Sequence, residues 1–158
     1  MSKPPYPPTA NLGLIFRQVR DAMWADMARE MALVGHELTY SQFMTIKHLA
    51  VDRTAGVTEL ARLAQLNPGA MTRLLDKLEA RGLLQRIADP ADRRALHIVL
   101  TEPGLRIWDD IRHCGQIVRD RAMLGMDENE REQLFRLLGQ VLQNLTATAN
   151  PTPPVSDD

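Results

Sequence analysis

The chain has 158 residues, a length that suits one domain with at most a small appendage and is enough to bury a hydrophobic core. The formal net charge of −1 gives no sign of a nucleic-acid partner, and the single cysteine excludes an internal disulfide framework. There is no apolar run of about 18 residues and no apolar segment near the N-terminus, so we expect neither a membrane span nor a secretion signal and predict a cytoplasmic protein.

The N-terminal region begins with a proline-rich lead, 1–10, which we expect to be disordered. Apolar residues then recur at helical spacing, at Leu12, Ile15, Phe16, Val19, Met23, Met27 and Met31. This pattern predicts a helix whose apolar face packs against another element.

Three further helices are predicted between residues 39 and 81. Thr39 and Gln42 have the spacing of a capping box, in which each side chain bonds the backbone N–H of the other residue, so a helix begins here. A short helix, 57–65, follows, and the polar turn 66–69 separates it from a longer one. Two helices joined by a tight polar turn predict a helix-turn-helix, whose second helix enters the major groove of DNA.

The longer helix has clear signals at both ends. Asn67 is a good N-cap, Pro68 suits the first helical position, where no donor is missed, and Gly82 has the place of a C′ glycine. The apolar residues form one stripe, at Met71, Leu74, Leu75 and Leu78. The opposite side is polar and partly basic, with Thr72, Arg73, Asp76 and Lys77.

Two aliphatic runs, 83–87 and 95–100, follow this helix, and the polar segment between them ends in Arg93 and Arg94. The second run alternates with a period of two, so we predict a β-hairpin with both arginines at or near its tip. Between residues 67 and 97 six basic side chains stand against four acidic ones, a local excess of two positive charges. A helix that fits the major groove, beside a hairpin that reaches phosphates or the minor groove, suits DNA.

An ordinary solvated surface is the alternative interpretation of both features. Helices commonly carry Arg and Lys on a solvated face, and hairpin tips are polar because they contact water. Two adjacent arginines at the tip favour the DNA interpretation, because a turn needs only Asn, Asp, Gly or Pro.

Two long helices are predicted after the hairpin. Thr101 has the place of an N-cap, and Asp127 with Glu130 forms a second capping box. The last helix carries a continuous apolar stripe, at Leu134, Leu137, Leu138, Val141, Leu142 and Leu145. An exposed stripe of this length would aggregate, so we expect a homodimer to cover it, and an intramolecular helical hairpin in a monomer is the alternative. The polar tail, 149–158, is expected to be disordered.

Several short motifs occur together between residues 72 and 104. They are TRLLDKLE at 72–79, RGL at 81–83, Arg86, DPADRR at 89–94, and LT at 100–101 with Gly104. Together they closely resemble the winged-helix core of the MarR family of bacterial transcription regulators, and a weaker similarity extends over 11–145. This family consists of ligand-responsive, dimeric DNA-binding repressors and, less often, activators.

The resemblance implies a mainly α fold with a small β-hairpin wing. It implies a single domain, 11–148, in which a winged helix-turn-helix core, 39–101, binds DNA and the flanking helices, 11–35 and 102–148, form the dimer. The implied function is that of a regulator that binds double-stranded DNA at a specific sequence, as a homodimeric repressor released by a small phenolic or aromatic ligand. The expected operator is a near-palindrome with half-sites about 34 Å apart.

The residues predicted to contact DNA lie on the helix and the wing, at Gly69, Ala70, Thr72, Arg73, Lys77, Arg86, Asp92, Arg93 and Arg94. Thr72 and Arg73 are expected at base edges or phosphates, because Arg73 can grip guanine with two parallel bonds, and Lys77 suits a phosphate. Family members often begin this helix with Ser and Thr hydroxyls, whereas this chain has Pro-Gly-Ala at 68–70. At that end the backbone N–H groups remain to bind a phosphate.

Roles in the wing are implied by the resemblance. The family's Asp-x-Arg pair matches Asp92 and Arg94, with the arginine reaching into the minor groove. Asp92 would orient this arginine, which otherwise has many rotamers to lose on binding. Arg86 and Arg93 are expected to add contacts to the DNA backbone.

Small molecules that act on the family, often phenolic or aromatic carboxylates, bind between the dimer helices and the winged core. By position, the candidate ligand-binding residues here are Trp24, Met27, Tyr40, Phe43, Met44, His48, Trp108 and Ile111. Methionine and aromatic side chains suit an adaptable apolar pocket. The alternative is that these residues belong to the ordinary hydrophobic core.

Other functions receive less support. Cys114 is interpreted as an ordinary thiol, since the peroxide-sensing branch of the family carries its reactive cysteine in the first helix, where this chain has none. The four histidines have no spacing that closes a metal site, and no nucleophile motif or phosphate-binding glycine loop occurs. We therefore expect no metal, no cofactor and no enzymatic activity. A winged-helix module for protein association, without specific DNA binding, is the remaining alternative, and a weak salt dependence would reveal it.

Overall fold

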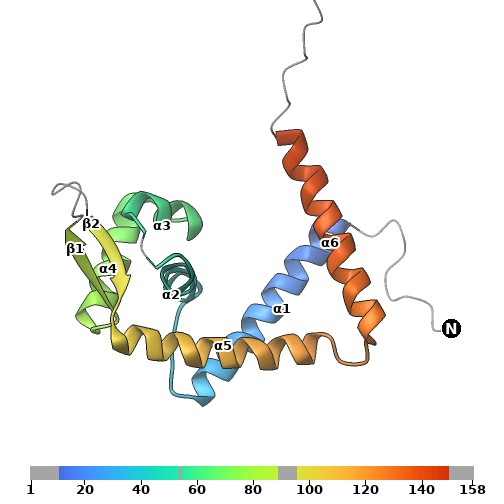
Figure 1. The fold of residues 1–158 in the computed structure, drawn as a ribbon, viewed down its shortest axis with the longest axis horizontal. Coiled ribbons are helices and arrows are strands. Elements are labelled where there is room, and N and C mark those ends of the chain that lie inside the picture. Colours follow the sequence, from blue (N-terminus) through green and yellow to red (C-terminus); the bar gives the residue numbers. More distant parts are fainter. Residues whose placement is uncertain (1–10, 54, 89–95, 150–158) are drawn as a thin grey trace, which may run out of the picture. The chain divides into compact units, whose positions relative to one another are not determined.

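The computed structural model describes residues 11–53, 55–88 and 96–149, and within these ranges it contains helices and one two-stranded antiparallel sheet (Figure 1). In chain order the elements are α1 (Leu12–Leu33), α2 (Tyr40–Asp52), α3 (Val57–Leu63), α4 (Pro68–Ala80), β1 (Leu84–Ala88), β2 (Leu96–Leu100), α5 (Glu102–Ala122) and α6 (Glu128–Ala149). This order confirms the predicted mainly α fold with one β-hairpin.

The chain forms two compact units, Met1–Arg119 and Asp120–Asp158. The first unit contains α1 to α4, the hairpin and most of α5, and the second contains the end of α5 and α6. Both candidate binding surfaces described below lie within the first unit. No helix in the described ranges combines the length and the apolar composition that crossing a bilayer requires.

Local capping bonds start the helices where the sequence predicts them. The Asn67 side chain accepts a hydrogen bond of 2.8 Å from a backbone N–H of the first turn of α4. Thr39 and Gln42 exchange bonds of 3.3 and 3.0 Å at the start of α2, and Asp127 and Glu130 exchange two bonds of 2.9 Å at the start of α6. These three predicted caps are confirmed. They could be predicted because a cap needs only groups that are three residues apart in the chain.

The hairpin pairs in antiparallel register over all five residues of each strand. The segment between the strands, 89–95, which contains the predicted tip arginines, lies outside the described residues. One further pairing was not predicted from the sequence: Ala55, just before α3, exchanges backbone hydrogen bonds of 3.3 and 3.1 Å with Ile98 of β2. The helix-turn-helix is thereby tied to the hairpin through the backbone as well as through side chains.

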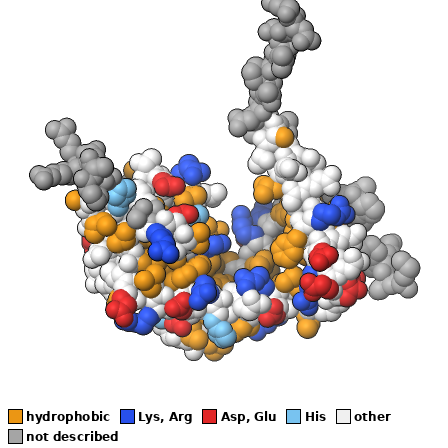
Figure 2. Space-filling model, viewed as in Figure 1, with side chains coloured by type: hydrophobic (Ala, Val, Ile, Leu, Met, Phe, Trp, Pro, Cys, Tyr) orange, Lys and Arg blue, Asp and Glu red, His pale blue; other side chains and the backbone are white. Residues whose placement is uncertain are grey.

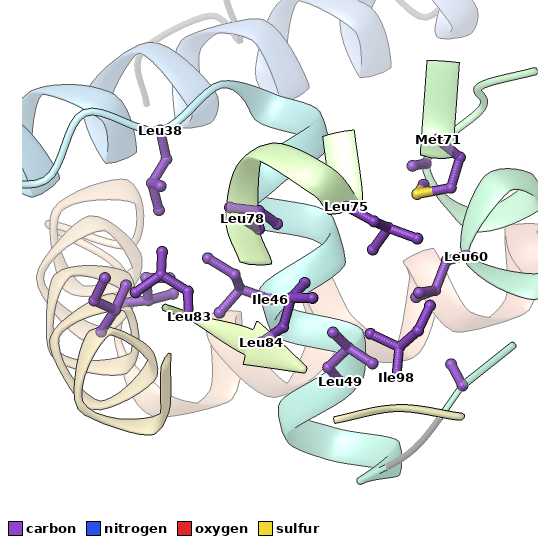
Figure 3. Packing of buried hydrophobic residues seen from close by; sticks show 14 of the residues in the cluster. Leu38, Ile46, Leu49, Leu60, Met71, Leu75, Leu78, Leu83, Leu84 and Ile98 are labelled. Carbon is purple, nitrogen blue, oxygen red and sulfur yellow. The ribbon is translucent and has the colours of Figure 1, made fainter. Parts of the chain in front are cut away.

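One hydrophobic core joins the helix-turn-helix to the hairpin (Figure 3). Fully buried side chains from α2, α3, α4 and both strands form its centre, namely Ile46, Leu49, Leu60, Met71, Leu75, Leu78, Leu84 and Ile98. The apolar stripe predicted for α4 is therefore buried, with Leu74 half-buried beside it. Because this stripe faces the core, the opposite face of α4 is turned to solvent.

The start of α5 packs on the base of the hairpin. The Thr101 hydroxyl donates to the carbonyl oxygen of Gly82 and accepts a hydrogen bond of 3.3 Å from the N–H of Gly104, which confirms Thr101 as the cap of this helix. Further along α5 the buried stripe consists of Ile107, Ile111, Cys114 and Val118. These contacts fix the direction in which α5 leaves the winged core.

Candidate functional site

The outer face of α4 presents a row of polar side chains to solvent. Thr72, Arg73 and Lys77 are exposed. Within the described ranges Arg73 and Lys77 take part in no ion pair or side-chain hydrogen bond. Both cations are therefore available to the phosphates or base edges of a duplex, while the buried stripe on the other side of α4 fixes the direction in which they point.

The N-terminal turn of α4 offers fewer free groups than the sequence suggests. The N–H of Ala70 is already bonded to the Asn67 side chain at 2.8 Å, and the Thr72 hydroxyl donates to the Pro68 carbonyl at 3.0 Å. In the described part of the chain the exposed Gly69 N–H makes no hydrogen bond. A phosphate at this end would thus meet the Gly69 N–H first, and Thr72 is left to act through its oxygen lone pairs.

Arg86 on β1 faces α4. Its side chain is only 21% exposed, one guanidinium nitrogen lies 2.7 Å from Asp76 Oδ1, and another contacts Glu79 Oε2. The backbone N–H of Arg86 also donates to Glu79 Oε1 at 3.3 Å. From the sequence, Arg86 is predicted to contact the DNA backbone. In the structure its guanidinium instead has two carboxylate partners on α4, the helix predicted to enter the major groove (the recognition helix).

The other predicted wing residues are Asp92, Arg93 and Arg94, and all three lie outside the described residues. They belong to the segment between β1 and β2, whose last described pair is Ala88 opposite Leu96. Their contribution to DNA binding therefore stays a prediction from the sequence.

A cleft of about 930 Å³ lies in the first unit between α1, α2 and α5. Seven of the eight residues proposed for ligand binding line it, namely Trp24, Met27, Tyr40, Phe43, Met44, Trp108 and Ile111. His48 is not among the lining residues, and its Nδ1 lies 3.7 Å from Asp52 Oδ2, one turn further along α2. The structure thus brings most of the predicted set together, and their binding of a ligand stays a prediction.

Aromatic rings form one wall of this cleft. The ring of Trp24 meets Tyr40 edge to face, with centroids 5.1 Å apart, and lies 5.4 Å from the ring of Phe43. Figure 2 shows hydrophobic side chains gathered over α2 and α5, with Lys and Arg side chains beside them. Such a surface suits a flat apolar molecule.

Basic residues at the cleft were missed in the sequence. Arg20, Lys47, Arg112 and Arg119 line it, and among the described residues no Asp or Glu does. Arg20 and Arg112 are paired with neighbouring carboxylates at 2.8 Å, whereas the exposed Lys47 makes no ion pair or side-chain hydrogen bond to any described residue. Helical spacing could have found Lys47, because it follows Phe43 and Met44 by four and three residues and so shares their side of α2.

Cys114 is buried on α5, on the same stripe as Ile111 and Val118, and is not among the residues that line the cleft. Burial raises the pKa of its thiol, and the negative charges of Glu30 and Asp110 raise it further. A thiol with a raised pKa is mostly protonated near neutral pH and is a poor nucleophile. Asp110 also lies 2.7 Å from Nε2 of His36, which connects α5 to the segment that follows α1.

The chain is similar in sequence and structure to known transcription regulators. The MarR family model matches residues 38–96. The HTH-type transcriptional regulator SarZ of Staphylococcus haemolyticus is 33% identical over 113 residues, 71% of this chain and 75% of SarZ. The HTH-type transcriptional repressor NicR of Pseudomonas putida is 25% identical over 140 residues, 89% of this chain and 87% of NicR. The crystal structure of a probable transcriptional regulator from Pseudomonas aeruginosa has a TM-score of 0.68 at 26% identity, over 84% of this chain and 97% of that one.

These similarities cover the elements that form the exposed face of α4. The matched family segment begins just before α2 and ends at the first residue of β2, so it contains the complete helix-turn-helix and the first strand of the wing. The similarity to SarZ extends over three quarters of that protein, and a third of the aligned positions are identical. This chain therefore belongs to the MarR family and is a DNA-binding transcriptional regulator with a winged helix-turn-helix fold.

Proposed function

We propose that this regulator is a homodimeric repressor that binds a near-palindromic operator and releases it when a small phenolic or aromatic ligand occupies the cleft. The main support for DNA binding is the row of exposed polar side chains on α4. Thr72, Arg73 and Lys77 are exposed there, on a helix whose other side is fixed in the core. An α-helix held in this way fits the width of the major groove.

Different parts of this surface have different tasks. Arg73 reads a guanine with two parallel hydrogen bonds, and Lys77 binds a phosphate as a point charge. The Gly69 N–H at the start of α4 positions a second phosphate, supported by the positive end of the helix dipole. The wing adds Arg94, which we place in the minor groove, with Asp92 orienting it and Arg93 on the backbone.

The apolar surface of α6 supports a dimer. Among the described residues of α6 no side chain is buried, and the large exposed ones are Phe135, Leu137, Leu138, Leu142 and Leu145. The N-terminal half of α1 is exposed in the same way, with Leu12, Leu14, Phe16, Val19 and Met23. A second copy of the chain buries such surfaces in a symmetric assembly, which matches the symmetry of a palindromic operator.

The composition of the cleft supports an acidic aromatic ligand. Its apolar wall binds a ring, and two lining cations, Lys47 and Arg119, have no carboxylate partner among the described residues. Arg119 donates to the neutral Gln116 amide, so Lys47 is the one of the two that makes no side-chain bond to a described residue. The cleft lies between α1 and α5, which we assign to the dimer, and α2, which belongs to the DNA-binding core. A ligand that binds one arrangement of these helices better than another shifts the population of the DNA-binding form.

Repression is the sign of regulation that we propose. NicR, which is similar to this chain over most of both sequences, is named as a transcriptional repressor. A dimer bound to two successive half-sites also prevents RNA polymerase from binding the same stretch of DNA. A reporter gene placed behind the operator should therefore become more active when the regulator is deleted.

The proposal is tested with duplex DNA from the region upstream of the regulator's own gene, titrated with purified protein at two salt concentrations. We expect tighter binding to this duplex than to random DNA, a steep loss of affinity with salt, and weaker binding by Arg94→Ala. Binding no better than to random DNA, unchanged by Arg94→Ala, would contradict both the operator and the wing assignment. The protein-association function would then be preferred.

Release by a ligand is tested on the same complex. We expect a panel of phenolic and aromatic carboxylates, salicylate included, to release the DNA, and the matching neutral amides to act only at higher concentration. In Lys47→Gln the advantage of the acid over its amide should shrink, because the lining cation that makes no side-chain bond within the described residues is gone. An acid that releases DNA equally well from Lys47→Gln would contradict the role of Lys47, and a panel without effect would contradict the cleft.

A further inference from the structure

Three polar contacts join one residue of the wing to two residues of the recognition helix. The Arg86 guanidinium lies 2.7 Å from Asp76 and in contact with Glu79, and the Arg86 N–H lies 3.3 Å from the same Glu79 carboxylate. Asp76 and Glu79 are three residues apart, so they project from the same side of α4. Together they hold the planar guanidinium at two of its nitrogens, which restricts it more than a single ion pair would.

Arg86 lies at the point of β1 where the covered part of the hairpin ends. Arg86 pairs across the sheet with Ile98, which is fully buried in the core below α4. Its neighbours towards the hairpin loop, Ile87 and Ala88, are exposed. Arg86 is therefore the last residue of β1 whose side chain is held against the body of the molecule, and the wing extends from this point.

We propose that Arg86 is a positioning residue that clamps the wing to the recognition helix at the distance that DNA requires. This inference rests on the proposed function, in which α4 and the wing contact DNA together. Asp76 and Glu79 then favour DNA binding although they carry the charge of the phosphates, because they hold Arg86. A rigid wing also loses less conformational freedom when it binds.

The alternative role, a direct phosphate contact by Arg86, disagrees with its surroundings. Two carboxylates and one guanidinium leave this cluster with a net negative charge, and the Arg86 side chain is four-fifths covered. A phosphate would have to displace both partners to reach it. Arg73 and Lys77 on the same helix offer charges that are already free of such partners within the described ranges.

Neutralising the two acids separates the alternatives by the sign of the effect. If Arg86 contacts phosphate, Asp76→Asn with Glu79→Gln removes repulsion and should tighten operator binding. If Arg86 is a clamp, the same double variant should weaken binding about tenfold, and it should do so without changing the salt slope. Glu128→Gln with Glu132→Gln, two exposed acids on α6, is the matched control for the loss of two negative charges and should leave affinity unchanged.

Variants of Arg86 itself provide a second test of the clamp. Arg86→Lys keeps the charge but lacks the planar guanidinium, which reaches Asp76 and Glu79 from two separate nitrogens. The clamp therefore predicts a loss of affinity close to that of Arg86→Gln. Neither should alter the slope of log K against log salt, whereas Lys77→Gln should reduce its magnitude by about 0.9. A slope reduced by Arg86→Gln and kept by Arg86→Lys would overturn the clamp in favour of a phosphate contact.

Coupling to the wing distinguishes positioning from a general loss of stability. If the clamp aims the wing, Arg94→Ala should cost about tenfold in affinity in the wild type and less than about threefold in Arg86→Gln, a coupling measured by a double-mutant cycle. Thermal unfolding of each variant identifies a temperature at which all of them are folded, and affinities are compared at that temperature. Additive effects would overturn the positioning role. A wild type that does not prefer the operator, or that ignores Arg94→Ala, would instead refute the proposed function.

Discussion

A Cβ atom on Gly104 would lie 2.0 Å from the carbonyl oxygen of Leu83. The first turn of α5 therefore touches the chain directly where it leaves the recognition helix and enters the wing. The same carbonyl accepts a hydrogen bond of 3.1 Å from the N–H of Thr101. Only glycine lets the helix and the segment before the strand approach this closely. The orientation of α5 relative to the winged core therefore depends on the absence of a Cβ atom at position 104.

Replacing this glycine tests the close approach. Gly104→Ala should lower the free energy of unfolding by about 3 kcal/mol, the upper end of the usual cost of overpacking, because the obstacle is backbone and cannot turn aside. Urea denaturation followed by circular dichroism measures the change. Gly115→Ala on the same helix is the control, since its Cβ would meet only the far end of Arg119 at 3.9 Å. Equal stability of the two variants would contradict the contact.

The N-cap of α4 makes a separate contribution to stability. Asn67→Ala should cost about 1 kcal/mol, because the Ala70 N–H loses the side-chain oxygen that now accepts its hydrogen bond. Asn67→Asp keeps an oxygen at the same place and should retain nearly full stability. Thermal unfolding of the three proteins is the measurement, and an Asp variant as unstable as the Ala variant would show that the cap is not the cause.

Arg73 and Lys77 should differ in their effect on specificity. Arg73→Ala should cost about 1–3 kcal/mol with the operator and much less with random duplex, because a bidentate contact reads one base. Lys77→Ala should weaken both complexes by a similar factor, because phosphates are the same in every sequence. Fluorescence anisotropy titrations with both duplexes measure this, with Arg136→Ala on α6 as the charge control. An equal loss on both duplexes for Arg73→Ala would place it on a phosphate.

Cys114 should react slowly in the folded protein. Burial and the nearby Glu30 and Asp110 charges raise its pKa, so at pH 8 the reactive thiolate is scarce as well as shielded. We expect a thiol reagent such as dithiobisnitrobenzoate to react at least about a hundredfold faster once urea unfolds the chain, and the folded rate to keep rising with pH above the ordinary range of a thiol pKa. Cys114→Ser gives the blank, and fast reaction of the folded protein near neutral pH would reopen a redox role.

A charge on the exposed apolar surface of α6 should separate the proposed dimer. Phe135 and Leu142 are 60% and 64% exposed, and in the dimer either one replaced by Glu would bury an unpaired carboxylate. Sedimentation at micromolar concentration should then show a monomer. The affinity for the operator should also fall, because a monomer binds only one half-site. Gln133→Glu, on an exposed polar position of the same helix, should remain dimeric. A wild type that sediments as a monomer would favour an intramolecular role for α6.

Much of this fold could be predicted from the sequence, because the determining contacts are short. Asn67 bonds the third residue after it, and Thr39 and Asp127 take part in reciprocal pairs with the same separation. The register of apolar residues on α4 likewise requires only the pitch of a helix. The motif from 72 to 104 then indicated the family, and with it the surface that we propose to face DNA.

Tertiary structure decided which charged side chains are free to bind a partner and which are already paired within the protein. Arg86 finds Glu79 seven residues earlier in the chain and Asp76 ten residues earlier, and no helical or strand period links a strand residue to those positions. Lys47 joins Trp108 at one cleft although 61 positions separate them in the sequence. The sequence by itself determined the helices, the hairpin and the family, since these depend on neighbours along the chain. Only packing, which sets distances between elements, decided that Arg86 faces two carboxylates and that Lys47 faces an apolar cleft.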